Sequence, residues 1–233
     1  MAAIAGAGID LSRQVIGGVA AASIEDAVLQ MRTIFDAGCR GVLMTPPFYF
    51  KDVTDDGLFA WFAGVFEKAA AGGEIILYNI PPVTQVTLSV DLIDRLKTAF
   101  PGLVTGVKDS SGDWDYTKRL LAAHAELAIL VGDERHLAPA MRLGAMGAIS
   151  GLANVIPGAL SPLIAEHRED ARIVAIVDAL LRYPVTAAVK ALIAHRTGDP
   201  SWLAMRPPLA ALPEPAAADL GALFDRLFPA KVA

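Results

Sequence analysis

The chain has 233 residues, of which 54% are hydrophobic and 19% are charged, a composition that suits one folded domain or two small ones and excludes general disorder. A net charge of −5 and an isoelectric point near 5.3 leave no basic stripe for a phosphate backbone, so we expect no nucleic-acid partner. The single cysteine, Cys39, excludes an internal disulfide and a thiolate metal cluster, and the four histidines lack metal-ligand spacing, so neither a metal nor a cofactor is expected.

Short apolar runs alternate with amphipathic stretches along most of the chain. The runs predict strands at Gln14–Val19, Gly41–Thr45, Glu74–Tyr78, Leu103–Lys108, Leu127–Val131 and Gly147–Ser150. Apolar residues at three- and four-residue spacing predict helices at Ile24–Ala37, Asp55–Ala70, Val90–Ala99, Tyr116–His124 and Arg135–Leu143. Ser23, Thr54 and Ser89 stand where helix caps are expected. This alternation, at about thirty residues per unit, indicates a parallel α/β architecture.

After the sixth strand the pattern changes to helices alone. These are expected at Ser161–Glu169, Ala171–Leu181, Pro184–Ala194 and Ala216–Phe228. We therefore predict a partial (β/α) barrel over residues 1–160 and a C-terminal helical extension over residues 161–233.

The chain offers no convincing membrane span or secretion signal. The uncharged stretch Leu143–Ala165 is long enough to cross a bilayer, but its glycines and prolines divide it into a short strand, a loop and a helix start. Met1–Leu11 has no basic region and reaches Asp10 too early for a secretory signal. A cytoplasmic protein without a membrane partner is expected.

Lys108 is the residue that most directly suggests chemistry. It ends an apolar run and precedes the turn-forming segment Asp109–Asp113, which places it at the carboxyl end of a buried strand. Apolar surroundings disfavour the charged amine, and the neutral amine can attack a carbonyl to form a Schiff base. The alternative is a structural lysine whose stem lies on apolar surface and whose charge reaches solvent.

The position of other polar residues favours a barrel over an open sheet. Tyr49, Tyr78, Lys108, Asp133 and Ser150 each follow a predicted strand, and the ends of many successive strands converge only in a closed ring such as a TIM (β/α)8 barrel. A dinucleotide-binding sheet would need a glycine-rich phosphate turn after its first strand, and the Gly-Gly-Val-Ala sequence there lacks the required spacing.

Four motifs together resemble the dihydrodipicolinate synthase / N-acetylneuraminate lyase family. They are Leu-Tyr-Asn-Ile-Pro around Tyr78, Gly-Val-Lys-Asp-Ser-Ser-Gly-Asp around Lys108, the segment Gly144–Asn154, and Arg206–Leu209. The resemblance runs from about Val15 to the C-terminus. It implies a class I aldolase in which Lys108 forms a Schiff base with pyruvate or another 2-oxo acid and Tyr78 shuttles protons.

The same resemblance suggests further contacts and partners. Tyr49 matches the aromatic residue that the family's tight dimer inserts into the neighbouring subunit's site, so a homo-oligomer, a dimer or a tetramer, is expected. Asp133, Ile149 and Ser150 are predicted to contact the substrate, with either Asp133 or Glu134 capping the helix that follows. Condensation of an amine with a 2-oxo acid gives a protonated imine that accepts electrons as a C–C bond forms or breaks.

Two departures from the family pattern narrow the expectation. The synthase branch has an arginine two residues after the proline of its Tyr-Asn motif, whereas this chain has Val83, so a lyase or aldolase on a 2-keto-3-deoxy sugar acid is the better interpretation. Gln14–Gly18 resembles the family's third strand, and no Gly-Thr-Thr-Gly-Glu carboxylate loop occurs, so we expect the third to eighth barrel strands without the first two βα units. A synthase or hydratase of the same family, and a non-catalytic oxo-acid binder or assembly subunit, stay open as alternatives.

Overall fold

The structure is a computed structural model that describes residues 2–69 and 73–229. They divide into two compact units: the first holds the described residues up to Leu130 together with Leu143–Met146, and the second holds Val131–Arg142 together with the described residues from Gly147 onward. This division differs from the predicted boundary at residue 160, which falls inside helix α9 (Pro157–Ala165). The reason is that α8 (Leu137–Arg142) packs against α9, and the short helix η1 (Glu134–His136) packs against the later helix α10 (Ala171–Leu180).

Six strands follow one another in a single sheet. They are β1 (Ile16–Val19), β2 (Gly41–Met44), β3 (Glu74–Asn79), β4 (Val104–Asp109), β5 (Ala128–Val131) and β6 (Gly147–Ala148). Their order in the sheet is β1-β2-β3-β4-β5-β6, and the pairs β1–β2, β2–β3 and β3–β4 are parallel. Sequential order with a helix after each strand is the arrangement of a (β/α) barrel, so the predicted strand number and fold type are confirmed.

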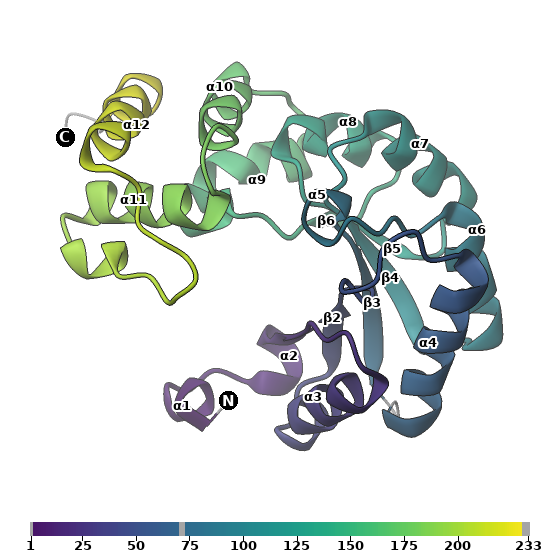
Figure 1. Cartoon of the computed structure of the whole chain (residues 1–233). Helices are drawn as coiled ribbons and strands as arrows, with labels where there is room; N and C mark the ends of the chain where they lie inside the picture. The colour runs from purple at the N-terminus through teal and green to yellow at the C-terminus, as the bar shows by residue number, and fades with distance from the viewer. Residues whose placement is uncertain (1, 70–72, 230–233) are drawn as a thin grey trace. The chain divides into compact units, whose positions relative to one another are not determined.

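The four longest helices of the first unit pack against one another in chain order, and the unit contains seven described helices. These seven are α1 (Ala2–Gly6), α2 (Leu11–Gln14), α3 (Ile24–Asp36), α4 (Asp55–Ala69), α5 (Pro81–Thr84), α6 (Val90–Ala99) and α7 (Trp114–Ala123). Helix α3 contacts α4, α4 contacts α6 and α6 contacts α7, and Figure 1 shows α3, α4 and α6 along one side of the strands. The predicted caps are present: Ser23 and Ser89 accept from the backbone N–H groups of Asp26 and Leu92.

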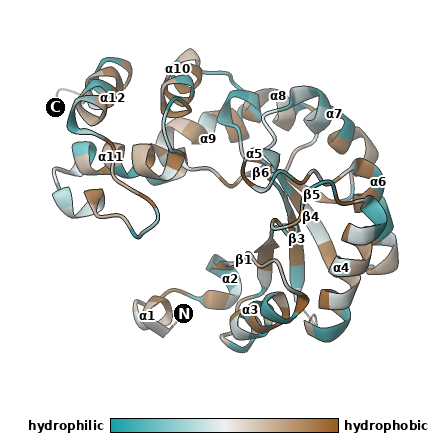
Figure 2. Cartoon of the chain, in the orientation of Figure 1, coloured by the Kyte–Doolittle hydropathy of each residue, from teal (hydrophilic) through white to brown (hydrophobic). Residues whose placement is uncertain are grey.

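The core of this unit lies between the strands and the helices. Ile75, Leu77 and Val107 on the strands and Phe62 on α4 are fully buried. Figure 2 shows hydrophobic colouring along β3 and mixed colouring along α3, as expected for a buried strand and an amphipathic helix. The predicted end of the second helix at Ala70 lies outside the described residues.

The second unit is mainly helical. It contains η1, α8, η2 (Leu152–Asn154), α9, α10, α11 (Val185–Thr197), η3 (Pro200–Leu203) and α12 (Glu214–Leu227). Helix α12 packs against α10 and α11, where Ile176, Leu192 and Phe224 are buried. From α9 onward the structure has helices and no strand among the described residues. None of the described helices has the length and apolar character needed to cross a membrane.

Candidate active site

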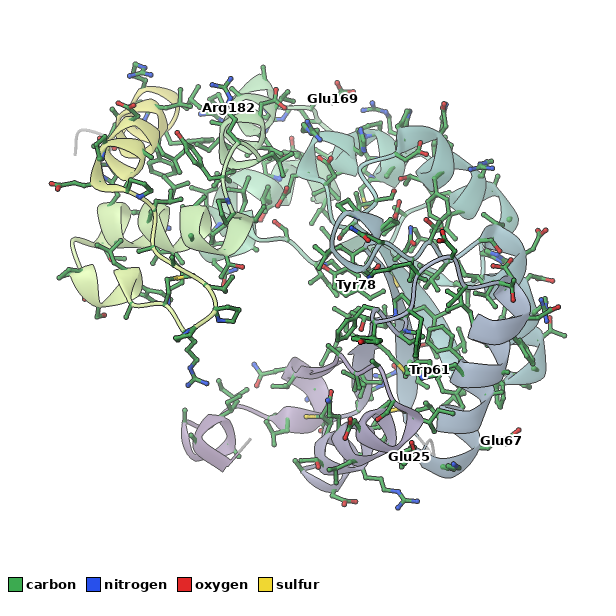
Figure 3. The ribbon with its side chains drawn as sticks, in the orientation of Figure 1. Glu25, Trp61, Glu67, Tyr78, Glu169 and Arg182 are labelled. Carbon is green, nitrogen blue, oxygen red and sulfur yellow. The ribbon has the colours of Figure 1, made fainter. Side chains whose placement is uncertain are left out.

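Tyr78 and Lys108 meet at the carboxyl ends of two neighbouring strands. In the parallel pairing of β3 with β4, Tyr78 lies opposite Lys108. The Nζ atom of Lys108 donates a hydrogen bond of 2.9 Å to the Tyr78 hydroxyl and lies 4.2 Å from the centre of the tyrosine ring. Lys108 is 9% exposed, and Figure 3 labels Tyr78 at the end of its strand. The predicted proximity of these two side chains is confirmed, and a snorkelling lysine is not what the structure shows.

Strands β4 and β5 approach each other closely just before Lys108. Gly106 lies two residues before Lys108, and a Cβ atom on it would stand 2.6 Å from the carbonyl oxygen of Ala128 on β5. That distance is shorter than real Cβ contacts allow, so only glycine lets the two strands approach this closely at the level of the site.

A buried polar network lies directly behind the Tyr78–Lys108 pair. Asn79 and Asp109, the last residues of β3 and β4, are both buried, and Asn79 Nδ2 donates to Asp109 Oδ1 at 3.0 Å. Thr117 on α7 donates to Asp109 Oδ2 at 2.6 Å. These residues were not predicted as functional, although Asn79 and Asp109 stand inside the motifs around Tyr78 and Lys108.

Tyr49 lies in the loop after β2 and is not joined to Tyr78 or Lys108. Its side chain is 74% exposed, and its ring packs edge-on against Phe50 with centroids 5.2 Å apart. The same loop is tied to α5 by Lys51, whose Nζ donates to the Thr84 carbonyl at 3.0 Å. A role for Tyr49 towards the substrate stays a prediction.

The other predicted site residues belong to the second unit. Asp133 caps η1 by accepting from the Arg135 backbone N–H at 3.1 Å, so the predicted capping role falls on Asp133. The Ser150 hydroxyl and the Leu152 backbone N–H both donate to Glu134, which is buried. Ile149 is half-buried just after β6. Substrate contacts by Asp133, Ile149 and Ser150 remain predictions.

An ion pair with Arg135 keeps Asp133 ionised. Burial alone would raise the pKa of this carboxyl, but hydrogen bonds from the Arg135 side chain and backbone outweigh it and hold the pKa below its usual range. The same pairing raises the pKa of Arg135, which also bonds Asp178 at 2.8 Å. Asp133 is therefore a stable anion at neutral pH.

A cavity of about 550 Å3 lies within the second unit and does not include Tyr78 or Lys108. Three of its carboxylates have basic partners: Asp178 pairs with Arg135, Glu169 with Arg142 and Asp170 with Arg172. Within the described residues, no group of three or more His, Cys, Asp or Glu side chains is placed to hold a metal ion.

Comparison with known proteins agrees with the fold. The family model described as the dihydrodipicolinate synthetase family matches residues 3–226. The chain belongs to this family.

Relatives of the chain include curated and structurally solved proteins. It is 33% identical over 220 residues to an uncharacterized DapA-like lyase of Chloroflexus aurantiacus, and the matched region covers 91% of this chain and 73% of that protein. Dihydrodipicolinate synthase from Agrobacterium tumefaciens, solved as a crystal structure, is 50% identical, with a TM-score of 0.94 over 97% of this chain and 79% of that one. A dihydrodipicolinate synthase from Acinetobacter baumannii, solved with pyruvate, is 29% identical with a TM-score of 0.83, over 96% of this chain and 77% of that one. The chain spans 47% of the curated Thermus thermophilus synthases that it matches.

Proposed function

We propose that the chain is a class I aldolase or lyase in which Lys108 forms a Schiff base with pyruvate or a similar 2-oxo acid. The observation that carries this proposal is the buried Lys108 amine held 2.9 Å from the Tyr78 hydroxyl. A buried amine is shielded from bulk water, and a neighbouring hydroxyl within hydrogen-bond reach can relay protons to and from the reacting atoms. The pyruvate complex of the Acinetobacter baumannii relative supports a 2-oxo acid as the ligand.

The proposed cycle needs only these two side chains for proton and electron transfer. The neutral Lys108 amine adds to the C2 carbonyl of the 2-oxo acid, and Tyr78 donates its hydroxyl proton to the departing oxygen, so that water leaves and a protonated imine and a Tyr78 phenolate remain. The phenolate takes the proton of the C4 hydroxyl, the C3–C4 bond breaks to release an aldehyde, and the electron pair of that bond passes into the imine as an enamine. Tyr78 then protonates C3, water adds to the imine, and a proton returns to Tyr78 as pyruvate leaves and the neutral amine is restored.

For the substrate, we propose a 2-keto-3-deoxy sugar acid or a similar hydroxylated oxo acid. Val83, on α5 just beyond Tyr78, is 73% exposed and offers no charge to a distal carboxylate. A synthase that condenses pyruvate with a carboxylate-bearing aldehyde is the alternative, and the name of the Agrobacterium tumefaciens relative favours it. Pyruvate release from the sugar acid, compared with pyruvate consumption with the aldehyde, separates the two.

The direct test of the Schiff base is reductive trapping. The purified chain is incubated with pyruvate and borohydride, and the modified lysine is located by peptide mapping. We expect a covalent adduct on the peptide that contains Lys108, none in the Lys108→Met variant, and a normal adduct in the matched surface variant Lys118→Met. An adduct on Lys51 or Lys118, or no adduct on the folded wild-type chain, would contradict the proposal, and the latter result would favour a non-catalytic binder.

We also propose that a second copy of the chain covers the exposed aromatic loop. Tyr49 and Phe50 are 74% and 69% exposed, and large aromatic side chains side by side on a surface are typical of protein interfaces. Sedimentation of the wild type and of Tyr49→Ala tests this. A wild type that is monomeric at micromolar concentration would contradict it.

A further inference from the structure

We propose that Asp109 and Asn79 are positioning residues that hold Lys108 and Tyr78 at reacting distance. This inference rests on the proposed function, because it assigns the buried network behind the Tyr78–Lys108 pair to the geometry of that pair. Neither Asp109 nor Asn79 is placed to touch the substrate, since successive residues of a strand point to opposite faces. Their effect is exerted through the strand ends.

The network joins the ends of β3 and β4 to each other. Asn79 lies opposite Asp109 in the parallel pairing, one rung beyond the Tyr78–Lys108 rung. Two hydrogen bonds close this last rung: Asn79 Nδ2 to Asp109 Oδ1 at 3.0 Å, and the Ser110 backbone N–H to the Asn79 carbonyl at 2.8 Å. A strand end that would otherwise fray is therefore fixed immediately next to the site.

The same two side chains attach the rung to surrounding elements. Asn79 Oδ1 accepts from the Leu88 backbone N–H at 3.0 Å, in the segment before α6. Asp109 Oδ1 accepts from the Ser111 backbone N–H at 3.0 Å, and Asp109 Oδ2 accepts from the Thr117 hydroxyl at 2.6 Å. The rung is thus anchored to α7, to the segment before α6 and to the loop after β4. These anchors leave the backbone of Lys108 and Tyr78 little freedom to move.

The donors around Asp109 fit an ionised carboxylate. Three hydrogen atoms point at its two oxygens, and the short Thr117 contact has the length of a charge-assisted O–H···O⁻ bond. The negative charge is also felt by Tyr116: burial, and then the charge of Asp109, raise the pKa of this phenol. Asp109 is a buried titratable group that the proposed cycle does not itself use.

An amide can take the place of this carboxylate without breaking the network. In Asp109→Asn, the side-chain oxygen still accepts from Asn79 and Ser111, and the new NH2 group can donate to the Thr117 oxygen. The Thr117 hydroxyl then donates to the Asp113 carbonyl, which already lies 3.0 Å away. Asp109→Asn therefore keeps the geometry and removes the charge, whereas Asp109→Ala removes both.

The test compares these two variants in single-turnover trapping with pyruvate and borohydride. Misplacement of reacting groups by about 1 Å costs on the order of 10²-fold in rate, so we expect Asp109→Ala to be trapped about 100-fold more slowly than the wild type at saturating pyruvate. The half-saturating pyruvate concentration should change by less than about threefold, because the ligand loses no contact. Asp109→Asn should stay within about threefold of the wild type.

The matched control for lost stability is His124→Leu. His124 caps the other end of α7, is buried and donates to the Val90 carbonyl at 3.1 Å, so its loss also removes a buried hydrogen bond on the same helix. We expect it to lower the unfolding midpoint and leave the trapping rate unchanged. A rate loss in His124→Leu as large as that in Asp109→Ala would overturn the proposal, because any destabilisation of α7 would then suffice.

Three further outcomes would overturn the assignment. Equal rates for Asp109→Ala and the wild type, or equally large losses in Asp109→Asn and Asp109→Ala, would overturn a geometric role. If Asp109→Ala does not fold, Thr117→Val, which removes one anchor at nearly constant volume, is expected to be trapped about fivefold more slowly, the factor that one average hydrogen bond gives. A wild-type rate for this variant would also overturn the proposal.

Acylation of the lysine separates this inference from the proposed function. Lys108 is labelled with a small acylating reagent and quantified by mass spectrometry, with Lys51 and Lys118 as internal references. Release of Lys108 from Tyr78 should raise its labelling in Asp109→Ala about fivefold. A wild type that pyruvate does not trap would refute the proposed function alone, whereas unchanged labelling in Asp109→Ala would refute the positioning role alone.

Discussion

Removal of the Tyr78 hydroxyl isolates the proposed proton shuttle. In Tyr78→Phe the ring that lies 4.2 Å from Lys108 Nζ remains, and only the hydroxyl at 2.9 Å is lost. A positioned acid or base contributes about 10²-fold to 10⁴-fold to a proton transfer, and we expect enamine formation from pyruvate to slow by that factor. The lost hydrogen bond should lower the free energy of unfolding by at most about 0.5–1.5 kcal/mol, because water can reach the half-buried Tyr78.

The assay is single-turnover formation of the enamine, followed by trapping, alongside urea unfolding. The matched control is Tyr116→Phe, which loses a buried hydroxyl that donates to the Leu88 carbonyl at 2.6 Å and does not contact Lys108. We expect the control to lose about 1–3 kcal/mol of stability and to keep its rate. A Tyr78→Phe rate within about threefold of the wild type would refute the assignment of Tyr78 as the proton shuttle.

Three further variants test other parts of the structure. Gly106→Ala forces a Cβ atom to within 2.6 Å of the Ala128 carbonyl oxygen, so we expect a stability loss above about 1 kcal/mol in urea and slower trapping of Lys108; wild-type behaviour would contradict the close approach. Val83→Arg changes an exposed position, so the free energy of unfolding should stay within about 0.5 kcal/mol of the wild type, while the use of a carboxylate-bearing aldehyde should improve. An unchanged substrate preference would show that Val83 does not determine the choice between the sugar acid and the carboxylate-bearing aldehyde. The folded-state pKa of Asp133 is depressed, so its stabilisation is complete above about pH 3.9 and is lost as the pH falls through the lower folded-state pKa. Asp133→Asn should therefore lower the urea midpoint at pH 7 and match the wild type in strong acid, and an equal deficit at both pH values would contradict the ion pair.

Much of the architecture could be predicted because hydrophobic periodicity and helix caps are local properties. The helix Val90–Ala99 was predicted at both ends, since Ser89 marks its start and its apolar spacing its length. Strand ends were less accurate. Strands β3 and β4 each extend one residue further than predicted, to Asn79 and Asp109, because polar residues at those ends are paired by side-chain hydrogen bonds that no periodicity reveals.

Other features could not be predicted, either because the local signal is weak or because they depend on contacts between residues distant in the sequence. Helix α9 begins at Pro157, whereas the predicted start was Ser161. Proline is favoured in the first turn of a helix, but the prediction relied on apolar residues at helical spacing, which were recognised only from Ser161 onward. The short helices α1, α2 and α5 have too few residues to show a period. The motifs predicted the Tyr78–Lys108 pair, whereas the anchoring of Asp109 by Thr117 depends on how α7 packs on β4 and could not be predicted from the sequence.

The measurement that tests the central claim most directly is deuterium exchange into the methyl group of pyruvate, followed by proton NMR in heavy water. Exchange requires both an imine on Lys108 and proton transfer at C3. We predict exchange well above the buffer rate for the wild type, none above buffer for Lys108→Met, and exchange slowed by about 10²-fold or more for Tyr78→Phe. No exchange by the folded wild type, or equal exchange by the wild type and Lys108→Met, would contradict the Schiff-base account.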